Sequence, residues 1–199
     1  MALGLRFLRV EFCLLTTMRI VAGIWRGRTL SAPPGSQTRP TADRVRQALF
    51  DMLLHAPWGG RDALEGARAL DVFAGTGALG LEVLSRGAAH ATFIEHDRTA
   101  LAALRANIAS LRADACCTVL PIDALAAPHG QPCSVIFLDP PYGQALVPRA
   151  LTRLRANGWI APTALIVAET ARDEPSPASV PLLAEREHGA ARISVWREQ

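Results

Sequence analysis

The sequence of 199 residues predicts an α/β fold: a doubly wound, mostly parallel sheet with helices on both faces and an antiparallel pair of strands at its C-terminal end. From residue 61 onward, short apolar runs alternate with segments of helical periodicity, which indicates repeated strand–helix units. A glycine-rich segment, Gly75–Gly80, follows the first run and opens the first helix. The last two runs, Leu182–Glu187 and Arg192–Arg197, are separated by a short turn, as in an antiparallel hairpin.

The main domain is expected to span residues 61–199. Its expected strands are Ala69–Ala74, Ala91–Glu95, Thr118–Ile122, Ser134–Leu138 and Ala164–Ala168, and its expected helices are Thr76–Arg86, Asp97–Leu111 and 144–156. Near-continuous apolar runs of this length are typical of parallel strands that are covered on both faces. Ligands of such sheets bind beyond the carboxyl ends of the strands, so we expect the chemistry there.

A small basic unit is expected to precede this domain, over residues 18–60. Its first part alternates loosely and contains Gly23 and Gly27, as in a short β-hairpin. After a loop rich in Pro, Gly, Ser and Thr, Thr41 can cap a helix that runs to about Leu54. The fold class is therefore an α/β domain with an N-terminal hairpin-helix extension.

Residues 1–17 resemble a signal peptide only loosely. Arg9 and Glu11 interrupt its apolar core, and no small-residue cleavage site follows. We interpret this segment as a start-site extension, with the organised chain opening at Met18. The longest uncharged stretches elsewhere are short for a membrane span and contain Pro, Gly or His, so we expect no membrane partner.

Positive charge is concentrated in the first third of the chain. All 21 basic residues are Arg; residues 1–60 contain eight of them against three acids, whereas residues 61–199 contain 13 against 15. This excess indicates an element that faces a polyanion, although a solvated basic face would look the same. The four cysteines show no metal-ligand or CxxC spacing, which favours reduced thiols, a cytoplasmic protein and no metal.

The glycine-rich segment predicts a site for an adenosine-containing cofactor. Gly75, Gly77 and Gly80 form a GxGxxG motif in its required context, where glycines let the backbone approach a ligand and a helix N-terminus offers N–H groups. Glu95 closes the second expected strand, 20 residues after Gly75, where a carboxylate can accept hydrogen bonds from ribose hydroxyls. These features fit NAD, FAD or S-adenosylmethionine equally, and Glu95 alone could be an ordinary exposed acid.

Two further acids bear on the identity of the cofactor. Asp71 enters the glycine turn, and a carboxylate there suits the cationic S-adenosylmethionine better than the pyrophosphate of NAD. Asp123 follows the third strand, where it could accept from the adenine amino group or could equally cap a helix that starts at Ala124. The balance favours S-adenosylmethionine.

The strongest signal is Asp139-Pro140-Pro141-Tyr142, directly after the fourth expected strand. The exocyclic nitrogen of a nucleobase is a poor nucleophile because its lone pair is delocalised into the ring. If the Asp139 carboxylate and the Pro140 carbonyl accept its two N–H bonds, the lone pair is directed at the methyl donor for in-line attack. The prolines stiffen the loop, and Tyr142 can stack on the base. A plain Pro-Pro turn would explain neither the acid nor the aromatic residue.

From Met18 to about Gln199 the sequence resembles the RsmD family, the 16S ribosomal RNA guanine-N2 methyltransferases, which have the Rossmann-like class I fold. The resemblance rests on Phe73–Glu82, on Asp139–Tyr142, and on an N-terminal stretch that contains Arg19–Gly23, Trp25–Arg28, Arg39–Thr41 and Asp43–Arg46. It implies a bacterial cytoplasmic enzyme, expected to be monomeric, that modifies one guanine of 16S rRNA within the small ribosomal subunit or its precursor.

The resemblance also implies three groups of site residues. The cofactor site would contain Asp71, Phe73, Ala74, Gly75, Gly77, Glu95, His96, Asp123, Ala124 and Asp139; the catalytic loop would be Asp139, Pro140, Pro141 and Tyr142; and RNA would contact Arg26, Arg28, Arg39, Thr41, Arg44 and Arg46. Arg44 or Arg46 could instead pair with a core acid, and Trp25 could pack beneath the hairpin.

We expect direct SN2 transfer from S-adenosylmethionine, with no metal and no covalent intermediate, since no cysteine lies in the Asp139 loop. Three alternatives stay open. The same loop would serve an adenine-N6 methyltransferase on DNA or RNA, or a protein-glutamine methyltransferase. An NAD oxidoreductase is disfavoured by Asp71 and the Asp139 loop. A non-catalytic RNA-binding assembly factor is disfavoured, because it would not need both the cofactor motif and the complete Asp139 loop.

Overall fold

The computed structural model describes residues 18–33, 40–174 and 180–199, without the side chains of residues 40–42. The interpretation of residues 1–17 and the assignment of Arg39 to RNA therefore lie outside the described residues, and so does the side chain of Thr41. No helix within the described ranges is long and apolar enough to cross a membrane.

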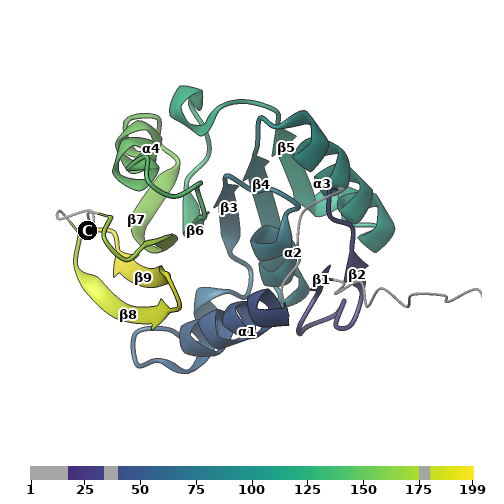
Figure 1. Ribbon diagram of the computed structural model, residues 1–199, viewed down its shortest axis with the longest axis horizontal. Helices are drawn as coiled ribbons and strands as arrows, with labels where there is room; N and C mark the ends of the chain where they lie inside the picture. The colour runs from purple at the N-terminus through teal and green to yellow at the C-terminus, as the bar shows by residue number, and fades with distance from the viewer. Residues whose placement is uncertain (1–17, 34–39, 175–179) are drawn as a thin grey trace, which may run out of the picture.

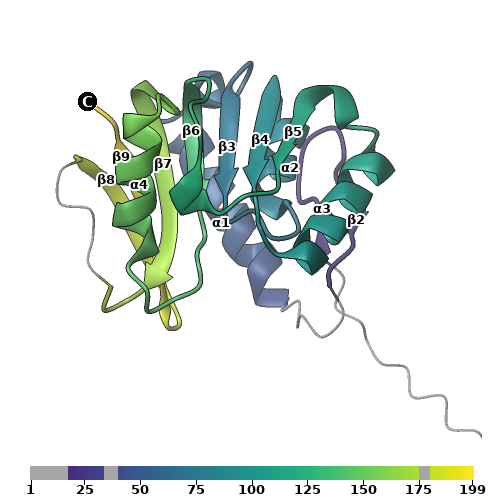
Figure 2. The same cartoon turned by 90° about the horizontal axis from the view of Figure 1, so that it is seen from above.

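A seven-stranded sheet forms the centre of the molecule, with strand order β5-β4-β3-β6-β7-β9-β8 (Figures 1 and 2). Its strands are β3 (Arg68–Val72), β4 (His90–Ile94), β5 (Cys117–Leu120), β6 (Cys133–Leu138), β7 (Ile160–Ala171), β8 (Leu182–His188) and β9 (Ala191–Arg197). The first five are parallel, while β9 runs antiparallel to both β7 and β8. This confirms the predicted fold class, including the antiparallel C-terminal pair.

Helices cover both faces of the sheet, and each face has its own hydrophobic core. The helices are α1 (Pro40–His55), α2 (Ala78–Ser85), α3 (Arg98–Leu111) and α4 (Leu146–Ala156), with 3-10 turns η1 (Arg61–Ala63), η2 (Asp114–Cys116) and η3 (Ala124–Ala126). On one face, α1, α2 and α3 pack over alternate strand residues that include Phe93 and Phe137. On the other face, α4 and η3 pack over the intervening residues, including Ile94 and Ile136. The alternation follows from the period of two in a strand.

Most strand boundaries differ from the sequence prediction by one to four residues, and two of these differences affect the carboxyl ends of strands at the centre of the sheet. β3 ends at Val72, two residues before the expected end, because the backbone turns at Phe73, which has a φ of 63°. β7 extends to Ala171, beyond the expected end at Ala168, because β9 pairs with it up to the register pair Ala171–Ala191. An apolar run in the sequence predicts only the buried part of a strand. It does not predict that the polar end continues as a strand because another strand pairs with it.

The N-terminal hairpin consists of β1 (Met18–Arg19) and β2 (Thr29–Leu30) and lies against the end of α2. The Ser85 hydroxyl accepts from the Trp25 N–H at 3.0 Å and donates to the Ala22 carbonyl at 2.6 Å. Gly23 has a φ of 81°, and a Cβ there would lie 1.7 Å from the Ser85 carbonyl oxygen. Only glycine therefore permits this close approach. The hairpin and α1 share the first core with the sheet.

Glu82 of α2 is the central anchor of this N-terminal unit. Its side chain is fully buried and accepts hydrogen bonds from the backbone N–H groups of Val21 at 2.7 Å and Ala22 at 3.0 Å. The same carboxylate lies 2.8 Å from the Arg86 guanidinium and 3.6 Å from that of Arg46. Two buried guanidinium groups thus share one buried carboxylate. The Asp43 carboxylate, 2.9 Å from the Arg46 guanidinium, supplies the second negative charge.

We predict that Glu82→Ala lowers the free energy of unfolding by about 3–5 kcal/mol, because it leaves two buried guanidinium groups and two N–H groups without their acceptor. The exposed Glu65→Ala serves as the matched control and should change stability by less than about 0.5 kcal/mol. Urea denaturation followed by circular dichroism measures both. Equal stability of the two variants would contradict the anchoring role.

Candidate active site

Four residues form a row across the carboxyl ends of neighbouring strands. The register pairs Val72 of β3 with Ile94 of β4 and with Leu138 of β6, and Leu138 in turn with Ala168 of β7. The next residue along each strand is therefore part of one row, in the order Glu95, Phe73, Asp139, Glu169. Neighbouring strands lie about 4.8 Å apart, so the sheet itself brings three carboxyl groups to one edge.

Glu95 holds the glycine turn in place. Its Oε2 atom accepts from the Gly75 N–H at 2.8 Å, and its Oε1 atom accepts from the N–H groups of His96 and Asp97, both at 2.7 Å. A carboxylate offers about four acceptor sites, so Glu95 can take roughly one more hydrogen bond without losing a backbone partner. Gly77 has a φ of 80°, and a Cβ there would lie 2.4 Å from the Leu104 Cδ1 atom. The turn thus needs glycine at Gly77.

Asp71 lies behind the glycine turn, not in the open site. It is buried, and its Oδ2 atom accepts from the Gly80 N–H at 2.8 Å. The pKa of Asp71 is raised to about 8, chiefly by burial and also by the Asp139 and Glu95 carboxylates, against the lowering effect of the Gly80 hydrogen bond. Asp71 therefore fixes the start of α2, and its charge can act on a ligand only from behind the turn.

Two cavities meet at Asp139. The first, here called the Glu95 cavity, has a volume of about 510 Å³ and is lined by Phe73, Glu95, His96, Asp97, Asp139, Pro140, Pro141 and Tyr142. The second, the Glu169 cavity, has a volume of about 700 Å³. Its walls come from the glycine turn, from α1 and β1, and from the turn between β8 and β9, and include Gly75, Thr76, Asp139, Tyr142 and Glu169. Asp139 and Tyr142 line both cavities, so a group bound in one can meet a group bound in the other at Asp139.

The ionisation of Asp139 is shifted by its surroundings. Desolvation by the walls around it, followed by the Glu169 carboxylate, raises the pKa of Asp139 to about 7. The residue still contacts solvent in the free protein. A ligand that fills the cavities would remove that solvent, so the protonation state of Asp139 then depends on whether the ligand donates hydrogen bonds to it.

Acids of β7 and the segment after it hold the loop that follows β6. The Tyr142 hydroxyl donates to the Glu169 Oε1 atom at 2.5 Å, and the Gly143 N–H donates to the Glu174 Oε1 atom at 2.6 Å. The Tyr142 ring itself is 46% exposed, so its face is available for stacking. Neither Glu169 nor Glu174 is among the site residues predicted from the sequence. A signal was present, since Glu169 directly follows the apolar run of this strand.

The structure brings together most of the predicted site residues but not all of them. Asp123 lies outside both cavities and caps η3, where it accepts from the Leu125 N–H at 2.9 Å. The helix-cap interpretation of Asp123 is therefore confirmed, and the buried Ala124 is simply the first residue of that turn. Ala74 and Gly77 shape the glycine turn without lining either cavity.

The predicted RNA-binding arginines divide into two groups. Arg46 is only 5% exposed and contacts Asp43, Glu82 and the Arg19 carbonyl, so its assignment to RNA is corrected: it pairs with a core acid, as the alternative interpretation held. Arg26 and Arg44 are exposed and, together with Arg19, line a hollow of about 490 Å³ between the hairpin and α1. Arg28 is exposed and donates to the Ser110 carbonyl at 2.7 Å.

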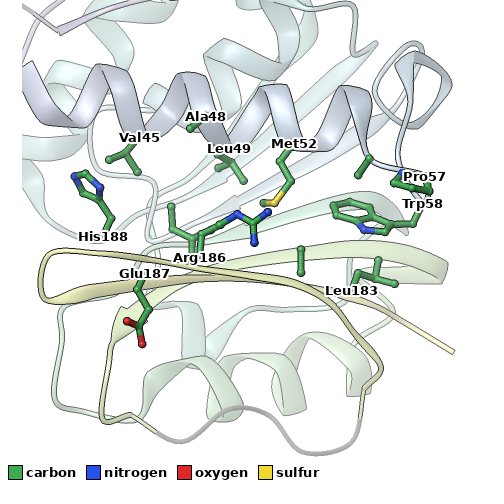
Figure 3. Close-up of a pocket in the computed structure, with 13 residues that line it drawn as sticks. Val45, Ala48, Leu49, Met52, Pro57, Trp58, Leu183, Arg186, Glu187 and His188 are labelled. Carbon is green, nitrogen blue, oxygen red and sulfur yellow. The ribbon is translucent and has the colours of Figure 1, made fainter.

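An apolar groove extends the Glu169 cavity between α1 and the β8–β9 pair (Figure 3). The two share Val45, Leu49, His188 and Ile193. Figure 3 shows the Arg186 guanidinium beneath α1 and the Glu187 carboxylate pointing away from it. The groove contains none of the predicted cofactor or catalytic residues, so we place the candidate active site at Asp139.

The chain has curated relatives of known description. The Ribosomal RNA small subunit methyltransferase D of Escherichia coli is 44% identical over 155 residues, covering 77% of this chain and 74% of the relative. The protein of the same description from Haemophilus influenzae is 38% identical over 187 residues, covering 90% and 93%.

Solved structures show the same fold. The Escherichia coli protein yhhF has a TM-score of 0.80 and 39% identity, with 92% of this chain and 98% of that chain covered. An RNA methyltransferase from Salinibacter ruber, solved with S-adenosyl-L-homocysteine, shares the fold alone, at a TM-score of 0.60 and 15% identity over 80% and 93% of the two chains. The family model described as Conserved hypothetical protein 95 matches residues 18–197. The chain therefore belongs to this family, the RsmD family, and has the class I methyltransferase fold.

Proposed function

We propose that the protein transfers a methyl group from S-adenosylmethionine to the exocyclic N2 of one guanine in bacterial 16S rRNA. The observation that carries the proposal is that Asp139, in an Asp-Pro-Pro-Tyr loop, lines two adjoining cavities, one beside the Glu95 turn and one beside the basic N-terminal unit. A methyl donor and an acceptor base need two such sites with one shared boundary. Membership in a family whose curated relatives are rRNA methyltransferases supports the same reading.

The Glu95 cavity suits the cofactor. Glu95 retains an acceptor site for a ribose hydroxyl, while Phe73 and His96 supply walls beside it. The Asp139 carboxyl group and, from behind the turn, that of Asp71 favour a cationic ligand, because a positive charge beside them stabilises their ionised forms and lowers the raised pKa of each. S-adenosylmethionine would supply an electrophilic methyl group there. A pyrophosphate would meet these acids unfavourably, which argues against a dinucleotide.

The Glu169 cavity suits the target base. A base in this cavity would present its amino group at the shared boundary. There, ionised Asp139 and the carbonyl of Pro140, a residue of the Glu95 cavity wall, accept the two N–H bonds, which fixes the nitrogen and directs its lone pair toward the methyl donor. Tyr142, whose hydroxyl is bonded to Glu169, presents its ring for stacking on the base. After transfer the alkylated amine is strongly acidic and loses its proton readily, so Asp139 need not be a strong base.

The basic surface beside this cavity suits rRNA. Arg19, Arg26 and Arg44 surround one hollow, with Arg28 on the same hairpin, and Arg side chains are suited to phosphate contacts. Asp43 and Asp51 line the same hollow and limit its net charge, so the arginines would position a phosphate and not simply attract RNA. We propose a monomeric cytoplasmic enzyme that acts on the small subunit or its precursor.

The decisive experiment maps methylated nucleosides in 16S rRNA from cells with and without the protein, and then asks whether the purified protein restores the missing one with labelled S-adenosylmethionine. N2-methylguanosine that disappears and is restored supports the proposal. Loss of N6-methyladenosine would identify the adenine alternative instead. Binding of RNA without any transfer would identify a non-catalytic assembly factor.

We predict that Asp139→Asn lowers kcat by about 10²- to 10³-fold, because a neutral carboxamide oxygen accepts the amino N–H more weakly than a carboxylate and does not stabilise the positive charge that develops on the nitrogen. Binding of S-adenosylhomocysteine, measured by calorimetry, should change by less than about fivefold, since the Glu95 contacts remain. The exposed Asp62→Asn is the matched control and should leave both quantities unchanged. Wild-type turnover in the Asp139 variant would remove the residue from the mechanism.

Activity is also predicted to depend on the ionisation of Asp139. With the pKa of this acid raised to about 7, the carboxyl group is largely protonated below pH 7 and accepts its N–H bond from the amino group much more weakly than the carboxylate does. The kcat/KM should therefore rise with pH, about tenfold per unit below pH 7, and level off above about pH 8. Asp139→Asn should show a flat profile over the same range. If the kcat/KM of the wild-type protein did not rise with pH below pH 7, the requirement for a carboxylate would be contradicted.

The arginine hollow predicts a change in the salt dependence of RNA binding. Arg26→Ala and Arg44→Ala should each lower the slope of log K against log salt by about one, because each removes one phosphate contact. Arg105→Ala, exposed on α3, is the control of equal charge and should leave the slope unchanged. Filter binding of 16S rRNA between 50 and 200 mM salt, about the range over which such slopes are resolved, provides the measurement. Equal slopes in all variants would exclude the hollow.

A further inference from the structure

Glu169 is positioned to contact the target base directly. The register pair Leu138–Ala168 puts Glu169 beside Asp139 on adjacent parallel strands, and both residues line the Glu169 cavity. Tyr142, the expected stacking partner of the base, donates its hydroxyl hydrogen to Glu169. One hydrogen bond uses only part of the roughly four acceptor sites of a carboxylate, so Glu169 can accept from a ligand at the same time.

Nucleobases differ in what they present next to their amino group. In guanine the carbon that bears the amino group lies between N3 and N1, and N1 carries a hydrogen, so the Watson–Crick edge offers consecutive donors. In adenine and cytosine the corresponding ring nitrogen carries a lone pair and accepts. When one protein side chain holds the amino nitrogen, the protein side chain next to it therefore faces either an N–H donor or a lone pair of the base.

We propose that Glu169 is the specificity-determining residue that accepts the N1–H of guanine while Asp139 accepts from N2. This inference rests on the proposed function and adds the reason for its choice of base. Two facing carboxylates repel each other, and an edge with consecutive donors relieves that repulsion. A base with a lone pair at this position places a hydrogen-bond acceptor against the Glu169 carboxylate, leaves the repulsion in place and is disfavoured.

The electrostatics of the cavity fit this assignment. The Glu169 carboxylate raises the pKa of Asp139, which shows that the two groups interact across the site. Arg46, the arginine that lines the same cavity, is engaged with Asp43 and Glu82. The donors that would balance Asp139 and Glu169 can thus come from the bound base.

The test replaces guanine by 2-aminopurine, which keeps the 2-amino group but has a lone pair at N1. Small subunits are reconstituted with 16S rRNA ligated to carry either base at the nucleotide mapped above. Wild-type protein should methylate the 2-aminopurine particle with a kcat/KM about 10- to 100-fold lower. Glu169→Gln, whose carboxamide can donate to N1, should reduce this preference to about threefold or less, or reverse it.

A matched variant separates base recognition from the positioning of Tyr142. Tyr142→Phe removes the hydrogen bond to Glu169 but keeps the ring and the carboxylate, so it should lower turnover on both particles and keep the wild-type preference. A preference that is unchanged in Glu169→Gln would overturn the inference, and so would its loss in Tyr142→Phe.

The wild-type comparison alone remains decisive if Glu169→Gln does not fold. Equal rates of the wild-type protein on the two particles would refute a role for Glu169 in reading N1–H. Failure of the proposed function has a different signature, because the wild-type protein would then methylate neither particle.

Discussion

The register of four parallel strands is the constraint on which the rest of the structure depends. Because β4, β3, β6 and β7 pair without a shift toward their carboxyl ends, the residues that follow the last parallel register pairs come to lie in one row. Backbone hydrogen bonds, not contacts between the side chains, hold Glu95, Asp139 and Glu169 close together. The sheet can therefore impose a concentration of negative charge that these residues would avoid in a flexible loop.

This arrangement has an electrostatic consequence. The sequence lacks lysine, and Glu95, Asp71 and Glu169 accept hydrogen bonds from N–H groups of the backbone and from one hydroxyl. These donors carry no net charge; burial, together with neighbouring carboxylates, raises the pKa values of Asp71 and Asp139. Such a site favours ligands that bring positive charge or hydrogen-bond donors, and the proposed methyl donor and amino acceptor have these properties.

The N-terminal unit is packed against the main domain and contributes to the same site. Buried Glu82 ties the hairpin to α2, the helix that the glycine turn opens, and the hairpin and α1 supply residues of the Glu169 cavity wall. The exposed arginines of this unit are thereby held at a fixed position relative to Asp139. Whatever the hairpin binds is presented to the catalytic loop in a defined orientation.

The sequence by itself determined the α/β class, the order of the elements, the glycine turn and the Asp139 loop, because these depend on local periodicity and on residues adjacent in the chain. Only the tertiary structure decided which acids share the site. Glu169 joins it through pairing between strands, whereas Asp123 and Asp71 turn to backbone N–H groups of η3 and α2. Likewise, Arg46 and Arg26 are both basic residues of one segment in the sequence. In the structure Arg46 is buried against Glu82, whereas Arg26 is exposed. Contacts between residues distant in the chain, such as Glu82 with Val21, have no periodic signal, so no pattern in a single sequence predicts them.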